Sequence, residues 1–317
     1  MAIERINISS WTREQWEEDR RKRKTIGGSD AAAVLGLSKY ASPYSLWAQK
    51  TGLFVPEDIS DKEAVRLGVD LEDYVAKRWM EATGKKLKRD NHIILNSDYP
   101  FAHANVDRLV IGEPDAGFEA KTTSSWEILQ QCQNGQYPDS WYCQMCHYMM
   151  VTGAKRWYLG VLVFGRGFFH FTLERNEEEI VALECAEAAF FQNVENNIPP
   201  AIDGSDASLA AVRKVFDKSA EGIQVDLAPI ENEVLRYRRT AEQIKALEGV
   251  LAVSTAKIQE FMGNAESGRF SGGRINWKTQ QRTTFDRKKF EEENGAIDPR
   301  YFKTTITRPF RVTEKEN

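Results

Sequence analysis

The chain has 317 residues, which is long for one small domain and favours two structural units. Its hydrophobic fraction of 41% and charged fraction of 28% are those of an ordinary globular protein. No stretch reaches the roughly 18 to 20 uninterrupted apolar residues that crossing a bilayer requires. The start, MAIERINISSW, lacks the apolar segment of a secretory signal. These features argue against a membrane protein and predict a cytoplasmic one.

Charge is spread unevenly along the chain. The net charge is −4, but residues 269–317 contain 12 Lys/Arg and 7 Asp/Glu, a local balance of +5, so the preceding 268 residues carry −9. A basic run, RRKRK, stands at residues 20–24. An acidic body with basic patches suits a DNA enzyme with an enclosed binding surface, although a charge run is more often a solvated face.

Three helices are expected first, at residues 29–35, 44–51 and 62–83. The third is amphipathic, because Leu71, Val75 and Trp79 recur at helical spacing and Gly84 follows its end.

Short strands should follow, and a helix interrupts them. The strands are expected at 92–95, 105–111 and 117–121, the helix at about 140–152, two more strands in RWYLGVLVFG and GFFHFTLE, and a closing helix at 177–196. This order predicts an α/β (α+β) fold with a mixed sheet flanked by helices.

Prolines and glycine in NNIPPAIDGSD mark the end of the first unit near Gly204. We therefore predict a core at 1–204, a linker at 205–225 and a helical plus β-hairpin extension at 226–317. The helix should occupy 226–262, with Gly249 as a candidate break, and packing on the core is favoured over an interaction coil. The hairpin should turn at Gly272-Gly273.

The sharpest chemical signal is Asp107 followed by Glu119-Ala120-Lys121. Alternate residues of a strand share a face, so Glu119 and Lys121 should project together, and Asp107 can approach from the neighbouring strand. Two carboxylates suit a hard cation such as Mg²⁺, which polarises a phosphate and activates water, while Lys121 can offset developing negative charge. A surface strand with a cross-strand salt bridge explains the pattern equally well.

Glu72 stands beside the apolar stripe of the long helix. A carboxylate so close to a buried face needs a partner, which a metal ion or Lys121 could supply. The alternative is a residue at the edge of the stripe that reaches solvent.

The segment RRKRKTIGGSDAAAVLG offers a phosphate site. Gly27 and Gly28 allow close backbone approach, Ser29 stands at a helix start, and the basic residues before it add positive charge. A terminal 5′ phosphate would suit such a site. A simple helix cap by Ser29 or Asp30 is the alternative.

Gln144 and Tyr148 lie one turn apart on a helix and can face one site, although Tyr148 is more simply a buried aromatic. Cys143 and Cys146 form a C-x-x-C beside His147. Zinc, an iron–sulfur cluster and a redox pair are conceivable there, but no second C-x-x-C exists, and buried thiols are favoured.

Five ordered motifs, IGGSDAAAVLG, LGVDLE, ANVDRLV, GFEAKTT and CQMCHYMMVTG, together resemble the YqaJ-type phage recombination exonucleases. That group is similar to the lambda exonuclease and shares the PD-(D/E)XK, or restriction-endonuclease-like, core. The resemblance spans about Arg20 to Gly204. It implies an enzyme, often a homo-trimer, that degrades the 5′-ended strand of linear double-stranded DNA and leaves a 3′ overhang for a phage single-strand annealing protein. It also implies a phage or prophage origin in a bacterial cytoplasm.

The resemblance assigns roles by position. Asp107, Glu119, the Ala120 backbone carbonyl and Glu72 would serve the metal, Mg²⁺ or in its place Mn²⁺. Lys121 would be the catalytic lysine, with Gln144 beside the metal. The DNA and 5′-phosphate group is Ser29, Arg23, Arg21 and Tyr148, with Arg23 the favoured basic residue. Cys146 replaces a second glutamine of the lambda-like pattern, so no role transfers there.

Three other functions stay open at this point. One is an endonuclease on the same core, another a non-catalytic DNA-end-binding protein, and a third a metalloprotein built on the C-x-x-C. The polarity of digestion follows from the resemblance alone.

Overall fold

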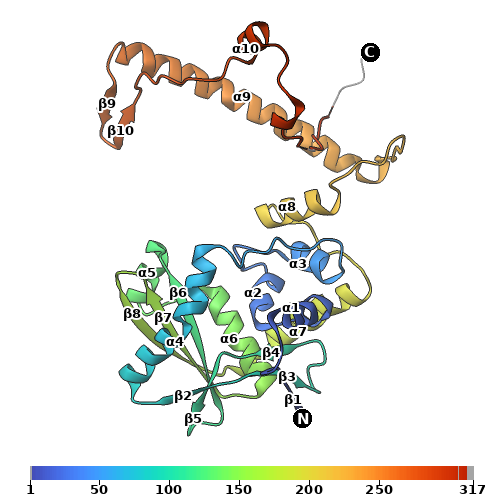
Figure 1. Cartoon of the computed structure of the whole chain (residues 1–317), viewed down its shortest axis with the longest axis vertical. Helices are drawn as coiled ribbons and strands as arrows, with labels where there is room; N and C mark the ends of the chain where they lie inside the picture. Colours follow the sequence, from blue (N-terminus) through green and yellow to red (C-terminus); the bar gives the residue numbers. More distant parts are fainter. Residues whose placement is uncertain (1, 306, 313–317) are drawn as a thin grey trace. The chain divides into compact units, whose positions relative to one another are not determined.

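The computed structural model describes residues 2–305 and 307–312, apart from the side chains of Glu17 and Arg21 (Figure 1). The chain forms two compact units, the first ending at Phe216 and the second beginning at Asp217. None of the described helices is long and apolar enough to cross a membrane.

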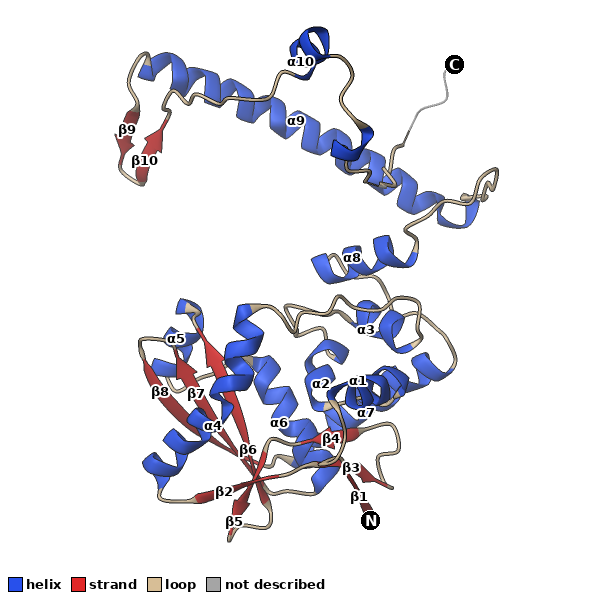
Figure 2. Cartoon of the chain, viewed as in Figure 1, coloured by secondary structure: helices blue, strands red, loops and turns tan. Residues whose placement is uncertain are grey.

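A five-stranded mixed sheet forms the centre of the first unit, with the strand order β2-β5-β6-β7-β8 (Figure 2). Its strands are β2 (Lys86–Arg89), β5 (Arg108–Ile111), β6 (Ala116–Thr123), β7 (Arg156–Val163) and β8 (Gly167–Glu174). Only β6 and β7 run parallel; the other neighbours are antiparallel. A second sheet joins β1 (Ile3–Asn7), β3 (His92–Asn96) and β4 (His103–Asn105).

Helices of the first unit flank this sheet. In chain order they are α1 (Arg13–Lys22), α2 (Gly28–Val34), α3 (Pro43–Lys50), α4 (Glu63–Thr83), α5 (Trp126–Gln133), α6 (Asp139–Thr152), α7 (Glu177–Glu195) and α8 (Asp206–Val215). The mixed sheet flanked by helices that the sequence predicts is therefore confirmed. Gly84 and Gly153 end α4 and α6 in the left-handed conformation, which glycine adopts without steric cost.

The two faces of β6 pack against different helices. Phe118 and Ala120 join an apolar cluster with Val75 and Trp79 of α4. The opposite face of the sheet packs with α6, because Leu159, the β7 neighbour of Glu119 in the register, belongs to the main core. Glu119 and Lys121 therefore point away from α4 and toward α6.

The predicted strand at residues 105–111 divides into β4 and β5, with Asp107 in the bend between them. The bend lies where the chain leaves one sheet for the other, so Asp107 is free of ladder pairing. Strands β1 and β2 and helices α1 and α5 were not predicted from the sequence. The eight residues of α5 carry only two buried side chains, Leu129 and Cys132.

The predicted linker at 205–225 contains α8, which belongs to the first unit. Ser208 of α8 is fully buried and donates to Ser42 Oγ at 2.7 Å, and Ala211 is buried beside it. The structure thus places the boundary after Phe216 rather than at Gly204.

The second unit is built around α9 (Glu231–Met262), a helix of 32 residues that Gly249 does not break. A short 3-10 turn, η1 (Ala228–Ile230), precedes it. The predicted hairpin is present as β9 (Ser267–Phe270) and β10 (Gly273–Asn276), but it turns at Ser271-Gly272 rather than Gly272-Gly273, because Gly273 already pairs with Phe270. It is followed by α10 (Arg287–Asn294) and η2 (Pro299–Tyr301). No described residue of α9 is buried.

Candidate functional site

Glu119 and Lys121 form the centre of the candidate site. Lys121 Nζ donates to Glu119 Oε1 at 2.6 Å, as expected for two residues on one face of a strand. Glu119 is 3% exposed. A charge this deeply buried requires compensation, and Lys121 supplies part of it.

Gln144 of α6 connects these two side chains to the helix. Its Nε2 donates to Glu119 Oε1 at 3.0 Å, and its Oε1 accepts from Lys121 Nζ at 2.8 Å. Nε2 also donates to the hydroxyl of Tyr148 at 2.8 Å. Gln144 and Tyr148, one turn apart, therefore face the same site and fix the Glu119–Lys121 pair.

Asp107 reaches this pair from the bend between β4 and β5. Its Oδ2 accepts a hydrogen bond from the Ala120 N–H at 3.3 Å. Burial, and then the neighbouring charge of Glu119, raise the pKa of Asp107 from its ordinary value to about 7. Two carboxyl groups so strongly coupled are poorly tolerated as anions unless a further cation joins them.

The residues at this point fit a hard divalent cation. Glu119 Oε2 is a buried oxygen without a hydrogen-bond partner, beside a carboxyl group whose ionisation is suppressed. Mg²⁺ prefers such carboxylate oxygens and keeps several waters. Among the described residues, however, no three His, Cys, Asp or Glu side chains gather in a metal-binding arrangement. A cation here would rest on Asp107 and Glu119, with the Ala120 carbonyl as the expected further ligand.

Glu72 lies on α4, near Asp107, whose negative charge, after burial, helps to raise the pKa of Glu72. Its partner in the structure is Arg108 rather than Lys121: Arg108 Nη2 donates to Glu72 Oε1 at 2.9 Å and to Asp73 Oδ1 at 2.5 Å. Arg108 is buried. In the sequence, only its position next to Asp107 indicated that it could belong to the site.

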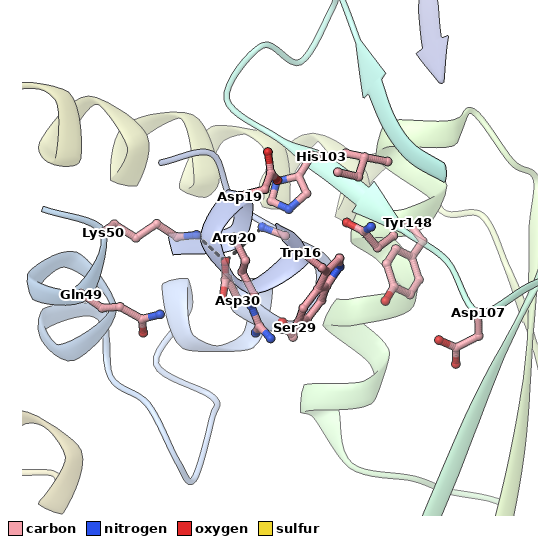
Figure 3. A pocket seen from close by; sticks show the side chains of 14 residues that line it. Trp16, Asp19, Arg20, Ser29, Asp30, Gln49, Lys50, His103, Asp107 and Tyr148 are labelled. Atoms are coloured by element: carbon pink, nitrogen blue, oxygen red, sulfur yellow. Dashed lines mark hydrogen bonds and ion pairs between the residues drawn. The ribbon is translucent and has the colours of Figure 1, made fainter. Parts of the chain in front are cut away.

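A cavity of about 230 Å³ extends from Asp107 toward the N-terminal helices (Figure 3). Asp107 and Tyr148 stand at one end of the view in Figure 3, and Gln49 and Lys50 at the other. Its wall comes from α1, α2, α3, β3, β4 and α6, with the lining residues including Trp16, Arg20, Ser29, Asn105 and His103.

The Gly27-Gly28 pair of the predicted phosphate site has a structural use. A Cβ at Gly28 would lie 2.4 Å from the ring of Tyr148, and one at Gly27 would lie 3.1 Å from His103 Nε2. The small residues thus let the start of α2 pack directly on the wall of the cavity. Ser29 follows as an exposed residue that lines it.

From the basic run at residues 20–24, Arg20 rather than Arg23 lines this cavity. Arg23 forms a two-bond ion pair with Asp19, at 3.0 and 2.9 Å, and lines a smaller neighbouring cavity. The side chain of Arg21 lies outside the described residues. Sequence reasoning could not choose among these arginines, because the choice depends on which side of α1 faces α2.

Lys50 adds a second cation to the cavity wall. Its Nζ lies 2.7 Å from Asp30 Oδ2 and donates to the Thr25 carbonyl at 2.8 Å. Burial alone would raise the pKa of Asp30, but Lys50 and the Gly27 N–H outweigh it and lower that pKa. Asp30 therefore holds Lys50 in place as a charged pair.

His103 completes the wall as a neutral side chain. Its Nδ1 lies 2.9 Å from Thr25 Oγ1, and burial followed by the charge of Lys50 lowers its pKa to about 3. An imidazole in this state can exchange hydrogen bonds with a ligand but carries no charge near neutral pH.

The C-x-x-C is not part of a metal-binding cluster among the described residues. Cys143 and Cys146 are both buried free thiols, and burial raises their pKa values to about 11 and about 12. His147 beside them pairs with Glu187 instead, at 2.8 Å. The interpretation of these cysteines as buried thiols agrees with this geometry.

The mixed sheet thus carries Glu119 and Lys121 on its central strand, and Asp107 joins them from the adjoining bend. A family model described as a YqaJ-like viral recombinase domain matches residues 15–155. A Bacillus subtilis (strain 168) protein, described as uncharacterized protein YqaJ, is 34% identical over 310 residues, 96% of each chain. The chain belongs to the YqaJ-like viral recombinase family.

Solved structures that are similar to part of this chain include two exonucleases. The crystal structure of the alkaline exonuclease LHK-Exo from Laribacter hongkongensis has a TM-score of 0.48 and 21% identity, and covers 58% of this chain and 94% of its own. A phage related exonuclease from Haemophilus somnus 129PT has a TM-score of 0.41 and 13% identity, over 55% and 94% of the two chains.

Proposed function

We propose that the protein is a metal-dependent exonuclease that hydrolyses the 5′-ended strand of linear double-stranded DNA. One observation carries the proposal: Asp107, Glu119 and Lys121 converge, and a buried oxygen of Glu119 lacks a partner. Burying polar atoms in this state is costly, so a site that keeps one is expected to use it.

Asp107 and Glu119 would hold Mg²⁺, or Mn²⁺ in its place, with the Ala120 carbonyl, and Glu72 would assist from α4. The bound ion would supply Lewis acidity toward the scissile phosphate and toward water. Lys121, fixed by Glu119 and Gln144, would place its ammonium against the attacking water and the developing negative charge. Asp107 must lose its proton to hold the cation, so its raised pKa of about 7 in the metal-free protein favours metal binding at alkaline pH.

The cavity beside Asp107 supports digestion from a 5′ end. Arg20 and Lys50 provide two cations, Ser29 a hydroxyl, and His103 a neutral hydrogen-bonding group, all on the wall of one cavity. A terminal 5′ phosphate has the charge and the acceptor oxygens to suit them. A strand end anchored there would present its first phosphodiester toward Asp107.

Membership of a viral recombinase family supports a recombination setting for this activity. In the proposed setting the enzyme leaves 3′ overhangs for a phage single-strand annealing protein, in the cytoplasm of a bacterial host, and encircles its DNA as a homo-trimer. Light scattering of the pure protein tests the trimer, and co-purification with the annealing protein of the same phage tests the partner.

The deciding experiment is digestion of linear duplexes labelled separately at each 5′ and each 3′ end, with Mg²⁺, with Mn²⁺ and with EDTA. Loss of the 5′ label as mononucleotide, only with a metal, is the expected result. Persistence of every label would reject the nuclease. Cleavage of closed circular plasmid would indicate an endonuclease, and binding of ends without hydrolysis would indicate a DNA-end-binding protein.

A further inference from the structure

Three segments meet beyond the carboxyl end of β6 and carry exposed aromatic and cationic side chains. They are the loop after α2, the start of α5, and the turn between β7 and β8. The Phe164 N–H donates to the Thr123 carbonyl at 2.9 Å, which fixes the turn to the end of β6. Lys39 Nζ donates to Glu127 Oε2 at 3.0 Å, which fixes the loop to α5.

Two aromatic side chains of this surface are turned to solvent. Tyr40 is 94% exposed, and Trp126 is 59% exposed although the guanidinium of Arg166 lies 4.8 Å from the centre of its ring. Two large rings beside two cations, one of which lies over a ring, are the composition of a surface that stacks nucleobases and pairs with phosphates.

The charge of the surface suits a polyanion. Arg166 and Lys39 are cations, and Glu127 is occupied by Lys39 in a solvent-exposed ion pair. Such pairs contribute little to stability, so Lys39 can exchange Glu127 for a phosphate at small cost.

The position of the surface connects it to the site. Trp126 follows Lys121 by five residues, so the two lie within about 18 Å of each other whatever the path of the chain. The parallel strands β6 and β7 both end at this surface, so a ligand on it would lie at the end of β6 that carries Lys121.

We propose that Tyr40, Trp126, Lys39 and Arg166 form a platform that binds single-stranded DNA by stacking its bases and pairing its phosphates. The inference rests on the proposed function for its biological use: the strand that remains after 5′-end digestion passes over the platform as it becomes single-stranded. The binding itself requires no hydrolysis.

The test measures fluorescence anisotropy of a fluorescein-labelled oligodeoxythymidylate with the full chain in EDTA, where no cleavage occurs. Trp126→Ala should weaken binding about fivefold or more, Trp126→Phe should retain most of it, and Arg166→Ala should weaken it about threefold. The control is Tyr74→Ala on α4, which removes a comparable exposed ring with Arg78 over it at 5.9 Å. Melting temperatures should match that of the unchanged protein.

Equal binding by the unchanged protein and Trp126→Ala would overturn the platform, as would equal losses in Trp126→Ala and Tyr74→Ala. A change in oligomeric state of Trp126→Ala by light scattering, with oligonucleotide binding intact, would instead assign the surface to contacts between copies and reject the proposal. If Trp126→Ala loses oligonucleotide binding while the unchanged protein never cleaves DNA, the platform is retained and the proposed nuclease activity is rejected.

Discussion

Helix α6 contacts two buried glutamates, whose carboxylate oxygens differ in their hydrogen-bond partners. Glu187, on α7, is fully buried and both of its oxygens lie within 3.0 Å of His147 Nδ1, while His147 Nε2 lies 2.9 Å from the His103 carbonyl. Glu119, on β6, has one oxygen bound by Lys121 and Gln144 and the other unpartnered. Glu187 thus forms a fully paired structural bridge between α6 and α7, whereas Glu119 keeps an oxygen that a further cation could bind.

The comparison predicts the largest effect on activity at Lys121. Lys121→Ala should lower kcat for duplex digestion by about two to three orders of magnitude, because the ammonium that stabilises the reacting phosphate is lost. Release of mononucleotides at saturating DNA and Mg²⁺ measures it. Lys155→Ala, at an exposed lysine paired with Asp115, is the matched control and should digest DNA normally. Retention of a tenth of kcat or more in Lys121→Ala would remove Lys121 from the mechanism.

The other half of the comparison predicts a loss of stability without a loss of chemistry. Glu187→Ala should reduce the free energy of unfolding by about 3 kcal/mol, because it leaves His147 buried without its counter-ion. Urea unfolding followed by circular dichroism measures it. The activity per folded molecule should change less than twofold, and a hundredfold loss would show that Glu187 belongs to the site.

The same pair predicts a pH dependence of stability. Burial alone would lower the pKa of His147, but Glu187 outweighs it and raises that pKa above the unfolded value of about 6.5. The contribution of the pair is therefore complete below the unfolded pKa and is lost as pH rises through the folded one. The stability difference between the unchanged protein and Glu187→Ala should be larger at pH 6 than at high pH, and a difference that grows with pH would contradict the assignment.

The polar face of β6 was predictable because its information is local. Strand alternation alone places Glu119 and Lys121 together, and the short connection from β5 brings Asp107 within reach. Gln144 and Tyr148 follow from one turn of helix. The sequence could not supply Arg108 as the partner of Glu72, since that contact depends on how α4 packs across the sheet.

The cavity wall was predictable at Asp107, Tyr148 and the Gly27-Gly28-Ser29 segment, which the sequence already singled out. Arg20, Lys50 and His103 come from three other segments, and each faces the cavity because of contacts far away in the sequence, such as that between Lys50 and Asp30. A single sequence holds no signal for such contacts. The domain boundary shifted for the same reason, because Ser208 and Ala211 reveal their burial only once α8 packs on α3.

A smaller effect should follow from the suppressed ionisation of Asp107. Its pKa of about 7 exceeds the unfolded value of about 3.9. The stability associated with its neutral form is therefore fully present below the unfolded pKa and is lost as pH rises through 7. In EDTA at pH 8, Asp107→Asn should therefore be more stable than the unchanged protein by about 2 kcal/mol. The full difference between the two pKa values corresponds to about 4 kcal/mol, and roughly half of it is expected because Asp107 lines the cavity and is partly exposed to solvent.

Thermal unfolding in EDTA at pH 5 and at pH 8 measures this difference, with Asn105→Ala as a neutral control on the same wall. The gain in Asp107→Asn should shrink at the lower pH, where the carboxyl group of the unchanged protein is protonated. A variant that is less stable than the unchanged protein at pH 8 would show that Asp107 is not strained by Glu119.

The thiols of α6 form a third kind of buried polar group and should give the smallest effect. Burial raises the pKa values of Cys143 and Cys146 to about 11 and about 12, and it also raises that of Cys132, so none of the three forms a thiolate near neutral pH. Cys185 is exposed. A thiol reagent at pH 8 should therefore modify one cysteine rapidly in the folded protein and all four in denaturant. Rapid modification of Cys143 or Cys146 would show that these thiols are accessible and reactive, and stoichiometric zinc in the purified protein would show that this helix binds a metal. Either result would reject the interpretation of Cys143 and Cys146 as buried, inert thiols.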